Sequence, residues 1–157
     1  MGEQVRDYPR PPRVEPVTKR VRIIFNGVTI ADTTRAQRVL ETFGAPVFYL
    51  PLAGVRADVL TETARNTVCE WKGPASYYSV RVADRIAENV GWAYRDPKPG
   101  YEALRDHIAF YCAPMDACFV GDERARPQPG GFYGGWITDE IIGPFKGEQA
   151  PRAGEPR

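Results

Sequence analysis

The sequence is poor in the residues that most often bind transition metals. It has three cysteines and one histidine among 157 residues, and no two cysteines form a C-x-x-C pair. A structural zinc site usually takes four such ligands in two close pairs. We therefore expect no metal site, and we expect Cys69, Cys112 and Cys118 to be free thiols in a reducing compartment.

Long hydrophobic runs are also missing. No apolar stretch approaches the roughly 18–20 residues that span a bilayer. The first ten residues, M-G-E-Q-V-R-D-Y-P-R, lack the apolar centre of a signal peptide. These absences predict a soluble, cytoplasmic protein that does not use a membrane as a partner.

The sequence also lacks an excess of positive or negative charge. The 21 Lys and Arg residues face 20 Asp and Glu residues, which gives a formal net charge of +1. A dedicated nucleic-acid-binding domain is usually clearly basic, so we expect no nucleic-acid partner. The length and the 43% hydrophobic content suit one globular domain.

Standard catalytic signatures are absent. The sequence contains no G-x-x-x-x-G-K-[ST], no G-x-G-x-x-G, no G-x-S-x-G and no H-E-x-x-H. A histidine-dependent mechanism could use only His107, which a structural role explains more simply. Composition and motifs therefore leave open whether the chain is an enzyme, and they identify no cofactor and no oligomeric state.

The chain divides into three parts by composition. Residues 1–18 contain four prolines among charges and no apolar periodicity, which predicts a flexible, proline-rich arm. Residues 19–147 form a single predicted domain. Residues 148–157 read as a disordered tail.

Within the domain, short strands dominate. Asn26-Gly27 lies between two β-rich runs and predicts a type I′ hairpin. Further strand candidates are 46–51, 67–71, 75–82, 91–94 and 117–120, and one or two helical turns are expected in 55–60. The best helix signal is 101–108, where Tyr101, Leu104 and Ile108 form one apolar stripe. The pattern predicts a mainly β domain (β-rich α+β) with one or two short helices.

Three clusters could carry chemistry. In C-E-W-K-G-P-A-S-Y-Y (69–78), Lys72 can reach over a glycine turn toward an anion and would favour the thiolate of Cys69 if both faced one cavity; a plain hairpin also explains the segment. In 35–41, Arg35 and Arg38 could clamp an anion or form exposed ion pairs. In F-Y-G-G-W (132–136), Tyr133 and Trp136 could stack on a ligand or close one end of the core.

Taken in order, these segments resemble the domain-of-unknown-function 427 family (DUF427). The resemblance rests on I-A-D-T-T-R-A-Q-R-V-L-E, V-F-Y-L-P-L-A-G-V-R-A-D-V-L, T-V-C-E-W-K-G-P-A-S-Y-Y, W-A-Y-R-D-P, I-A-F-Y and F-Y-G-G-W, over about residues 20–147. The C-x-x-K-G-x-A-x-Y segment is the most specific. This chain has Glu70 and Trp71 where the family commonly has Pro and Tyr.

The resemblance implies compact, folded-over antiparallel sheets similar to the Mss4-like β-tent fold. Several such relatives hold zinc on two C-x-x-C knuckles, which this chain lacks. The family carries a nucleotidyltransferase-like label. The obvious acidic pairs, Asp122-Glu123 and Asp139-Glu140, accompany no phosphate-binding glycine loop, so the label predicts little here.

The family pattern brings nine positions into one hypothesis: a pocket for a small anionic ligand with a flat or apolar part. Its predicted residues are Arg35, Arg38, Tyr49, Asp58, Cys69, Lys72, Tyr77, Trp92 and Tyr133. The tyrosines and Trp92 would form the walls, the three basic residues a cationic end, and Cys69 the most reactive group. Two alternatives stay open: an enzyme, by nucleotidyl transfer or by thiol chemistry at Cys69, and a non-catalytic protein-interaction module.

Overall fold

The computed structural model describes residues 2–147, and it is mainly β, with 49% strand and 8% helical content and no helix of seven or more residues. The mainly β, antiparallel prediction is confirmed, while the match to the Mss4-like tent stays a prediction. The strands are β1 (Glu3–Gln4), β2 (Arg13–Pro16), β3 (Val21–Phe25), β4 (Val28–Thr33), β5 (Gln37–Leu40), β6 (Val47–Pro51), β7 (Leu60–Cys69), β8 (Gly73–Val82), β9 (Arg85–Ala93), β10 (His107–Phe110), β11 (Ala117–Val120), β12 (Glu123–Arg124), β13 (Arg126–Pro127), β14 (Trp136–Ile137) and β15 (Ile141–Ile142). The 3₁₀ turns are η1 (Val5–Asp7), η2 (Leu52–Gly54), η3 (Ala57–Val59) and η4 (Glu102–Leu104).

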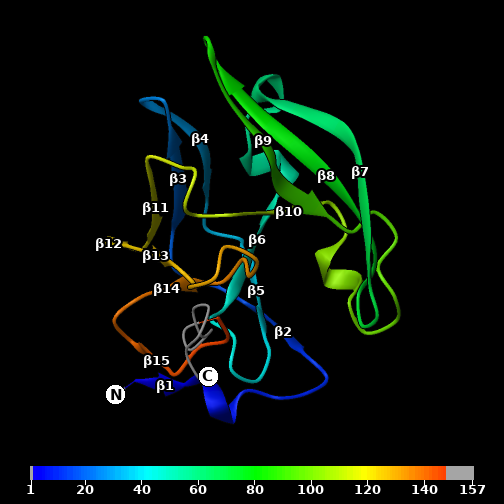
Figure 1. Ribbon diagram of the computed structural model, residues 1–157, viewed down its shortest axis with the longest axis vertical. Helices are drawn as coiled ribbons and strands as arrows, with labels where there is room; N and C mark the ends of the chain where they lie inside the picture. The colour runs from blue at the N-terminus through cyan, green and yellow to red at the C-terminus, as the bar shows by residue number, and fades with distance from the viewer. Residues whose placement is uncertain (1, 148–157) are drawn as a thin grey trace, which may run out of the picture.

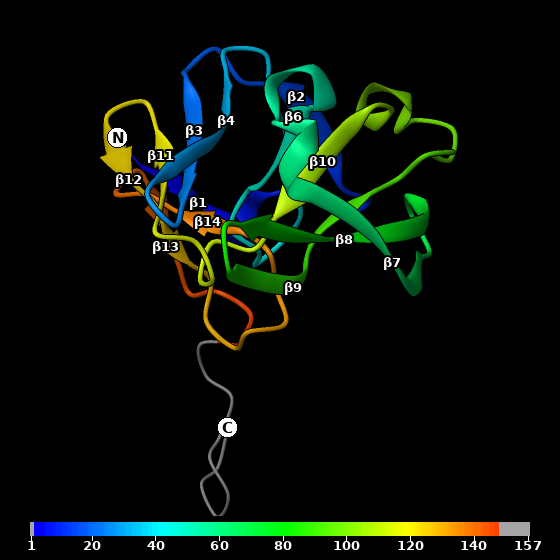
Figure 2. The same ribbon diagram turned by 90° about the horizontal axis from the view of Figure 1, so that it is seen from above.

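Two antiparallel sheets form the body of the molecule (Figure 1). The larger has seven strands in the order β2-β5-β6-β10-β9-β8-β7, and the smaller has four in the order β12-β11-β3-β4. Seen from above, β3, β4 and β11 lie on one side and β6 to β10 on the other (Figure 2). Two short pairs, β1–β15 and β13–β14, join distant parts of the chain.

The predicted hairpin is confirmed. β3 and β4 pair antiparallel with Phe25 opposite Val28, so only Asn26 and Gly27 form the loop. Both have positive φ, 48° and 76°, as a type I′ turn requires. The side-chain amide of Asn26 also donates to the carbonyl of Val82, 3.1 Å away, which ties the hairpin to the large sheet.

The main core lies between the two sheets. Alternate residues of β3 point inward with those of β6 and β10, because successive side chains of a strand face opposite sides. The fully buried members include Val21, Ile23, Phe25, Leu50 and Phe110. One face of the large sheet therefore packs against the small sheet, and its other face carries a separate cluster of side chains.

The segment predicted as a flexible arm is instead part of the fold over its described residues. β2 pairs with β5 at the edge of the large sheet, where a terminal proline costs no ladder hydrogen bond. Val5 and Tyr8 are buried against Leu40 and Ile141. The prediction of a flexible arm rested on the proline and charge content of the segment, and it overlooked the few apolar residues that anchor it. The predicted tail, 148–157, lies outside the described residues.

The helix predicted over 101–108 is wrong. Only η4 is helical, and the chain then turns at Asp106, which has a φ of 61°. Tyr101, Leu104 and Ile108 are all buried, but Ile108 packs between the sheets while the other two cover the opposite face of the large sheet. His107 begins β10 opposite Pro51. The stripe therefore predicted correctly that these three residues are buried, but its helical spacing does not correspond to a helix.

Arg38 holds the N-terminal segment to the large sheet. Its side chain is 16% exposed and pairs with Glu3 at 3.0 Å and with Glu15 at 2.5 Å. Although partial burial alone would raise it, hydrogen bonds from Arg38 and Tyr8 hold the pKa of Glu3 below its ordinary value of 4.5.

This pairing predicts a pH dependence of stability. A carboxylate with a lowered folded-state pKa stabilises the fold above its unfolded pKa, and the contribution is lost as pH falls through the folded value. As the pH falls from neutral to well below 4.5, the free energy of unfolding of the wild type should drop by about 1 kcal/mol more than that of Glu3→Gln. This figure allows for screening of the ion pair by solvent. Urea unfolding of both proteins at several pH values measures this, and parallel curves for the two proteins would contradict it.

Candidate functional site

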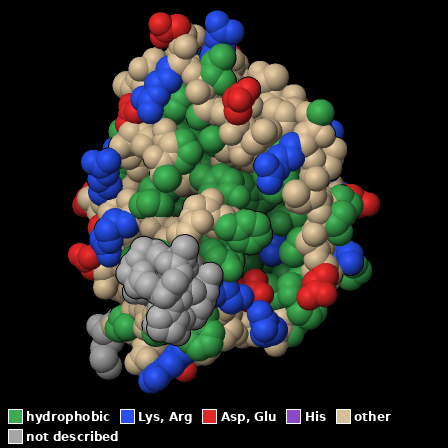
Figure 3. Space-filling view, viewed as in Figure 1, with side chains coloured by type: hydrophobic (Ala, Val, Ile, Leu, Met, Phe, Trp, Pro, Cys, Tyr) green, Lys and Arg blue, Asp and Glu red, His purple; other side chains and the backbone are tan. Residues whose placement is uncertain are grey.

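The face of the large sheet opposite the main core carries a second buried cluster, which is largely aromatic. Register places Tyr49 of β6, Ala109 of β10, Trp92 of β9 and Tyr77 of β8 side by side across four neighbouring strands. Because directly opposed residues point to the same side, these side chains share one face. The aromatic cluster comprises Val39, Tyr49, Ala75, Tyr77, Trp92, Tyr94, Tyr101, Leu104 and Ala109. Figure 3 shows hydrophobic side chains gathered around a hollow on this side of the molecule.

A small residue at the centre lets the aromatic side chains meet. Ala109 stands between Tyr49 and Trp92 in the row, and the indole Nε1 of Trp92 reaches across it to donate to the hydroxyl of Tyr49 at 3.3 Å. Trp92 also packs on Tyr111, with ring centroids 4.8 Å apart. Burial raises the pKa of Tyr49 and of Tyr94, so both phenols stay protonated at neutral pH and can donate hydrogen bonds.

The turn between β7 and β8 brings Cys69 and Lys72 to this cluster. β7 ends at Cys69 and β8 begins at Gly73, whose φ of 108° suits glycine. The carbonyl of Lys72 accepts from the amide of Lys98 at 3.0 Å, which fixes the turn. The Cys69 side chain packs against the aromatic cluster, and the Lys72 ammonium lies 5.7 Å from the ring centroid of Tyr94.

Lys72 is mostly buried and has no acidic partner within residues 2–147. Its exposed fraction is 9%, and among residues 2–147 no carboxylate lies within ion-pair distance of its ammonium. Buried lysines are usually paired, because an isolated charge is costly away from water. A cation–π contact with Tyr94 is the interaction that the structure supplies.

The hollow beside Lys72 has a volume of about 110 Å³. We call it the Lys72 hollow; among its lining residues are Glu41, Gln128, Tyr133 and Lys146. Glu41 pairs with Arg10 at 3.5 Å. The side-chain amide of Gln128 accepts from the backbone N–H of Ala45 and donates to the carbonyl of Lys146. The hollow therefore offers the ammonium groups of Lys72 and Lys146 beside a carboxylate that is already paired.

A second hollow, of about 690 Å³, adjoins the first. We call it the Arg65 hollow; Arg65, Asn89, Tyr111 and Cys112 are among the residues that line it, and it shares Gln128, Tyr133 and Gly135 with the Lys72 hollow. The guanidinium of Arg65 lies 4.8 Å from the ring centroid of Tyr77. The segment around Tyr133 thus lines both hollows.

The F-Y-G-G-W segment divides its residues between packing and surface. Trp136 belongs to the core, with its indole Nε1 donating to the carbonyl of Phe110 at 3.0 Å. A Cβ at Gly134 would collide with the ring of Trp92, so this glycine permits the close approach. Tyr133 is half-buried and lines both hollows. Trp136 therefore closes the core, and the stacking of Tyr133 on a ligand stays a prediction.

Three of the predicted site residues lie away from the cluster. Arg38 is occupied by Glu3 and Glu15. Arg35 is exposed before β5, and Asp58 is exposed in η3 and pairs with Arg56 at 2.6 Å. The predicted cationic end made by Arg35, Arg38 and Lys72 is therefore wrong. Tyr49, Cys69, Lys72, Tyr77 and Trp92 lie in or beside the aromatic cluster, and Tyr133 lines the Lys72 hollow.

Sequence reasoning missed four residues that complete this region: Arg65, Tyr94, Tyr111 and Lys146. Strand alternation carried a usable signal for three of them. Arg65 has the same parity as Cys69, Tyr94 as Trp92, and Tyr111 as Ala109. Lys146 comes from a loop far along the chain, and no local pattern indicates its position.

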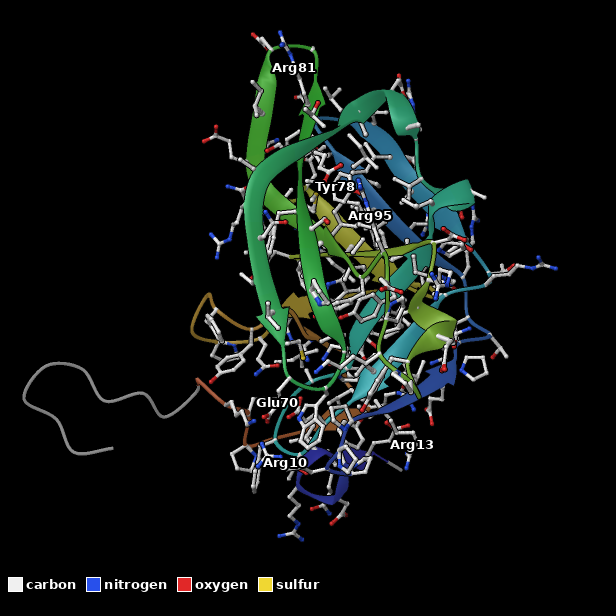
Figure 4. All side chains as sticks on the ribbon, turned by 90° about the vertical axis from the view of Figure 1, so that its right-hand side faces the viewer. Arg10, Arg13, Glu70, Tyr78, Arg81 and Arg95 are labelled. Carbon is white, nitrogen blue, oxygen red and sulfur yellow. The ribbon has the colours of Figure 1, made fainter. Side chains whose placement is uncertain are left out.

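The β7–β8 turn also meets the N-terminal segment. Figure 4 labels Glu70 in this turn, with Arg10 and Arg13 at the same end of the molecule and Arg81 at the other. Trp71 and Arg13 line a common surface hollow, and the hydroxyl of Tyr101 donates to the carbonyl of Pro12 at 2.8 Å. Farther up, Arg95 donates to the hydroxyl of Tyr78 at 3.0 Å. These contacts fix the ends of the strands that carry the cluster.

Within 2–147, no group of three or more His, Cys, Asp or Glu side chains is arranged to hold a metal ion. No helix in the same range is long and apolar enough to cross a membrane.

A family model described as a domain of unknown function (DUF427) matches residues 13–121, which confirms the resemblance found in the sequence. The matched range runs from β2 through β11 and includes Tyr49, Cys69, Lys72, Tyr77 and Trp92. No curated protein matches the chain.

Proposed function

The chain belongs to the DUF427 family of domains of unknown function, and we propose that it binds a small anionic ligand with a flat or apolar part in the Lys72 hollow, beside the aromatic cluster, with Lys72 as the anchor. The proposal includes a cytoplasmic location and a Mss4-like arrangement of the sheets. Neither nucleic acid nor a membrane is part of it.

The Lys72 ammonium, which has no carboxylate partner among residues 2–147, carries the proposal. The Lys72 residue is only 9% exposed, so its charge is less hydrated than that of an exposed lysine, and the ring of Tyr94 offsets part of the loss. An anion entering the Lys72 hollow would supply the missing counter-charge as a charge-assisted hydrogen bond. The site is therefore more favourable when occupied by an anion than when filled by water.

Size and chemistry limit the anionic group. Since one water takes about 30 Å³ of liquid volume, a hollow of 110 Å³ accepts a group the size of a carboxylate or a phosphate. Lys146 supplies a second ammonium at its wall, and Tyr133 supplies a flat surface. A ligand with an aromatic ring beside its acid group uses both features.

A thermal-shift experiment tests the proposal with inorganic phosphate, benzoate and phenyl phosphate as probes. A ligand at about 100 times its Kd stabilises the fold by about 2.7 kcal/mol, or about 5–10 °C for a domain of this size. We expect phenyl phosphate to raise the melting temperature of the wild type. Lys72→Met should melt near the wild-type temperature without ligand and should show no rise with it.

The matched control is Lys19→Met, which removes an exposed lysine that pairs with Glu140 at 3.5 Å. This variant should respond to phenyl phosphate as the wild type does. An equal response of Lys72→Met and the wild type would refute the anchor, and an unfolded Lys72→Met would show that Lys72 is structural. A screen silent for every probe would favour the protein-interaction module instead.

A further inference from the structure

Two β-bulges interrupt the large sheet, one on each side of β8. In β7, residues 63–65 lie opposite the single residue Tyr77. In β9, residues 88–90 lie opposite the single residue Ser79. Bulges are common at sheet edges and next to active sites, where they redirect a side chain. The side chains of these two bulges therefore need not follow the alternation of the strands that carry them.

The two bulges meet across β8. The hydroxyl of Thr63 donates to the side-chain oxygen of Asn89 at 2.6 Å, although β7 and β9 are two strand spacings, roughly 10 Å, apart. Asn89 has a φ of 54°, and its backbone N–H donates to the hydroxyl of Ser79 at 3.1 Å. A non-glycine residue in the left-handed region costs free energy, so these hydrogen bonds hold the β9 bulge in its shape.

Both bulges contribute a charged side chain to the Arg65 hollow. Arg65 comes from the β7 bulge and Glu88 from the β9 bulge. Neither forms an ion pair with the other or with any side chain in the described range 2–147. The hollow therefore presents one guanidinium and one carboxylate that are both available to a ligand.

Much of the remaining wall is apolar. Val90, Pro114, Pro127 and the ring of Tyr111 are among its lining residues. The hydroxyl of Tyr111 donates to the carbonyl of Phe132 at 3.2 Å, so this polar atom already has a partner. The volume of about 690 Å³ falls within the range of about 300–1,000 Å³ that is typical of small-molecule pockets. The hollow therefore suits a small molecule that has an apolar body and two opposite charges.

We propose that the Arg65 hollow binds an aromatic α-amino acid, a zwitterion whose carboxylate contacts Arg65 and whose ammonium contacts Glu88. The guanidinium of arginine presents parallel N–H donors that match a carboxylate, and a glutamate carboxylate accepts hydrogen bonds from an ammonium. The aromatic side chain packs against Tyr111 and the prolines. This site is separate from the one proposed above, because Lys72 lines the other hollow and Arg65 lines this one.

Titration calorimetry at neutral pH with three ligands of similar shape tests the proposal. Phenylalanine carries both charges, hydrocinnamate lacks the ammonium, and phenethylamine lacks the carboxylate. We expect phenylalanine to bind the wild type about tenfold more tightly than phenethylamine, because the amine loses the hydrogen bonds to Arg65. Equal affinities for these two ligands, or no heat of binding with phenylalanine, would overturn the proposal.

Two variants assign the contacts. Glu88→Gln should weaken phenylalanine about tenfold and leave hydrocinnamate unchanged, whereas Arg65→Gln should weaken phenylalanine by a similar factor and leave phenethylamine unchanged. Both residues are exposed, so we expect both variants to fold. The matched control is Arg81→Gln, which removes an exposed arginine at the far end of β8 (Figure 4) and should bind phenylalanine as the wild type does.

The variants also decide which hollow holds the ligand. Wild-type affinity of Arg65→Gln for phenylalanine, together with loss of binding in Lys72→Met, would place the amino acid in the Lys72 hollow and contradict the proposal. If a variant does not fold, the comparison of phenylalanine with phenethylamine on the wild type still decides, because it needs no substitution.

Discussion

Trp136→Ala is expected to lower the free energy of unfolding by about 3–5 kcal/mol, the usual range for removing a fully buried tryptophan. Trp136 has an exposed fraction of 0% and packs on Phe48, with ring centroids 5.2 Å apart. Its indole also satisfies the carbonyl of Phe110. The substitution leaves a cavity between the sheets and an unpaired buried acceptor, so two penalties add.

The neighbouring Phe132 is a matched control, because it lies four residues earlier in the same segment and is 75% exposed. Phe132→Ala should change the unfolding free energy by less than about 0.5 kcal/mol. Urea unfolding monitored by circular dichroism measures both variants. Similar losses for the two would contradict the placement of Trp136 in the core.

Gly134→Val is expected to destabilise the domain by about 1–3 kcal/mol through overpacking and to disturb the aromatic cluster. The new Cβ would collide with the ring of Trp92. Trp92 can avoid the collision only by moving away from Tyr49 and Tyr111, with loss of its hydrogen bond and ring contact. Near-ultraviolet circular dichroism and binding of phenyl phosphate should change together.

A double-mutant cycle separates this clash from a general effect of the loop. In a Trp92→Ala background the collision is absent, so Gly134→Val should cost less there than in the wild type. Gly44→Ala is the control, because its Cβ would meet the nearest atom at an ordinary 3.4 Å. Equal costs of Gly134→Val in both backgrounds would show that Trp92 is not the obstacle.

Much of the strand content could be predicted from local pattern. The Asn26-Gly27 turn, the run 117–120 and the run 75–82 match the hairpin, β11 and most of β8. Each signal is local, since turn chemistry or apolar alternation decides it within a few residues. The 101–108 stripe failed because a 3.6-residue spacing can also arise when a chain crosses from one face of a sheet to the other.

The sequence was sufficient to predict that the aromatic residues of the site lie together, but it was not sufficient to predict which basic residues lie near them. Tyr49, Tyr77 and Trp92 sit on strands whose pairing aligns them. Arg38 appeared free because its partner Glu3 is 35 residues away, in a segment that composition marked as flexible. Whether an arginine is available to a ligand depends on such distant carboxylates, and only the folded arrangement reveals them.

A crystal structure of the protein grown with phenyl phosphate is the most direct test of whether an anion binds Lys72 in the Lys72 hollow. We expect phosphate density within about 3 Å of the Lys72 Nζ atom, the usual length of a charge-assisted hydrogen bond, with the phenyl ring against Tyr133. An empty hollow at saturating ligand, or an ammonium turned outward to solvent, would contradict the account.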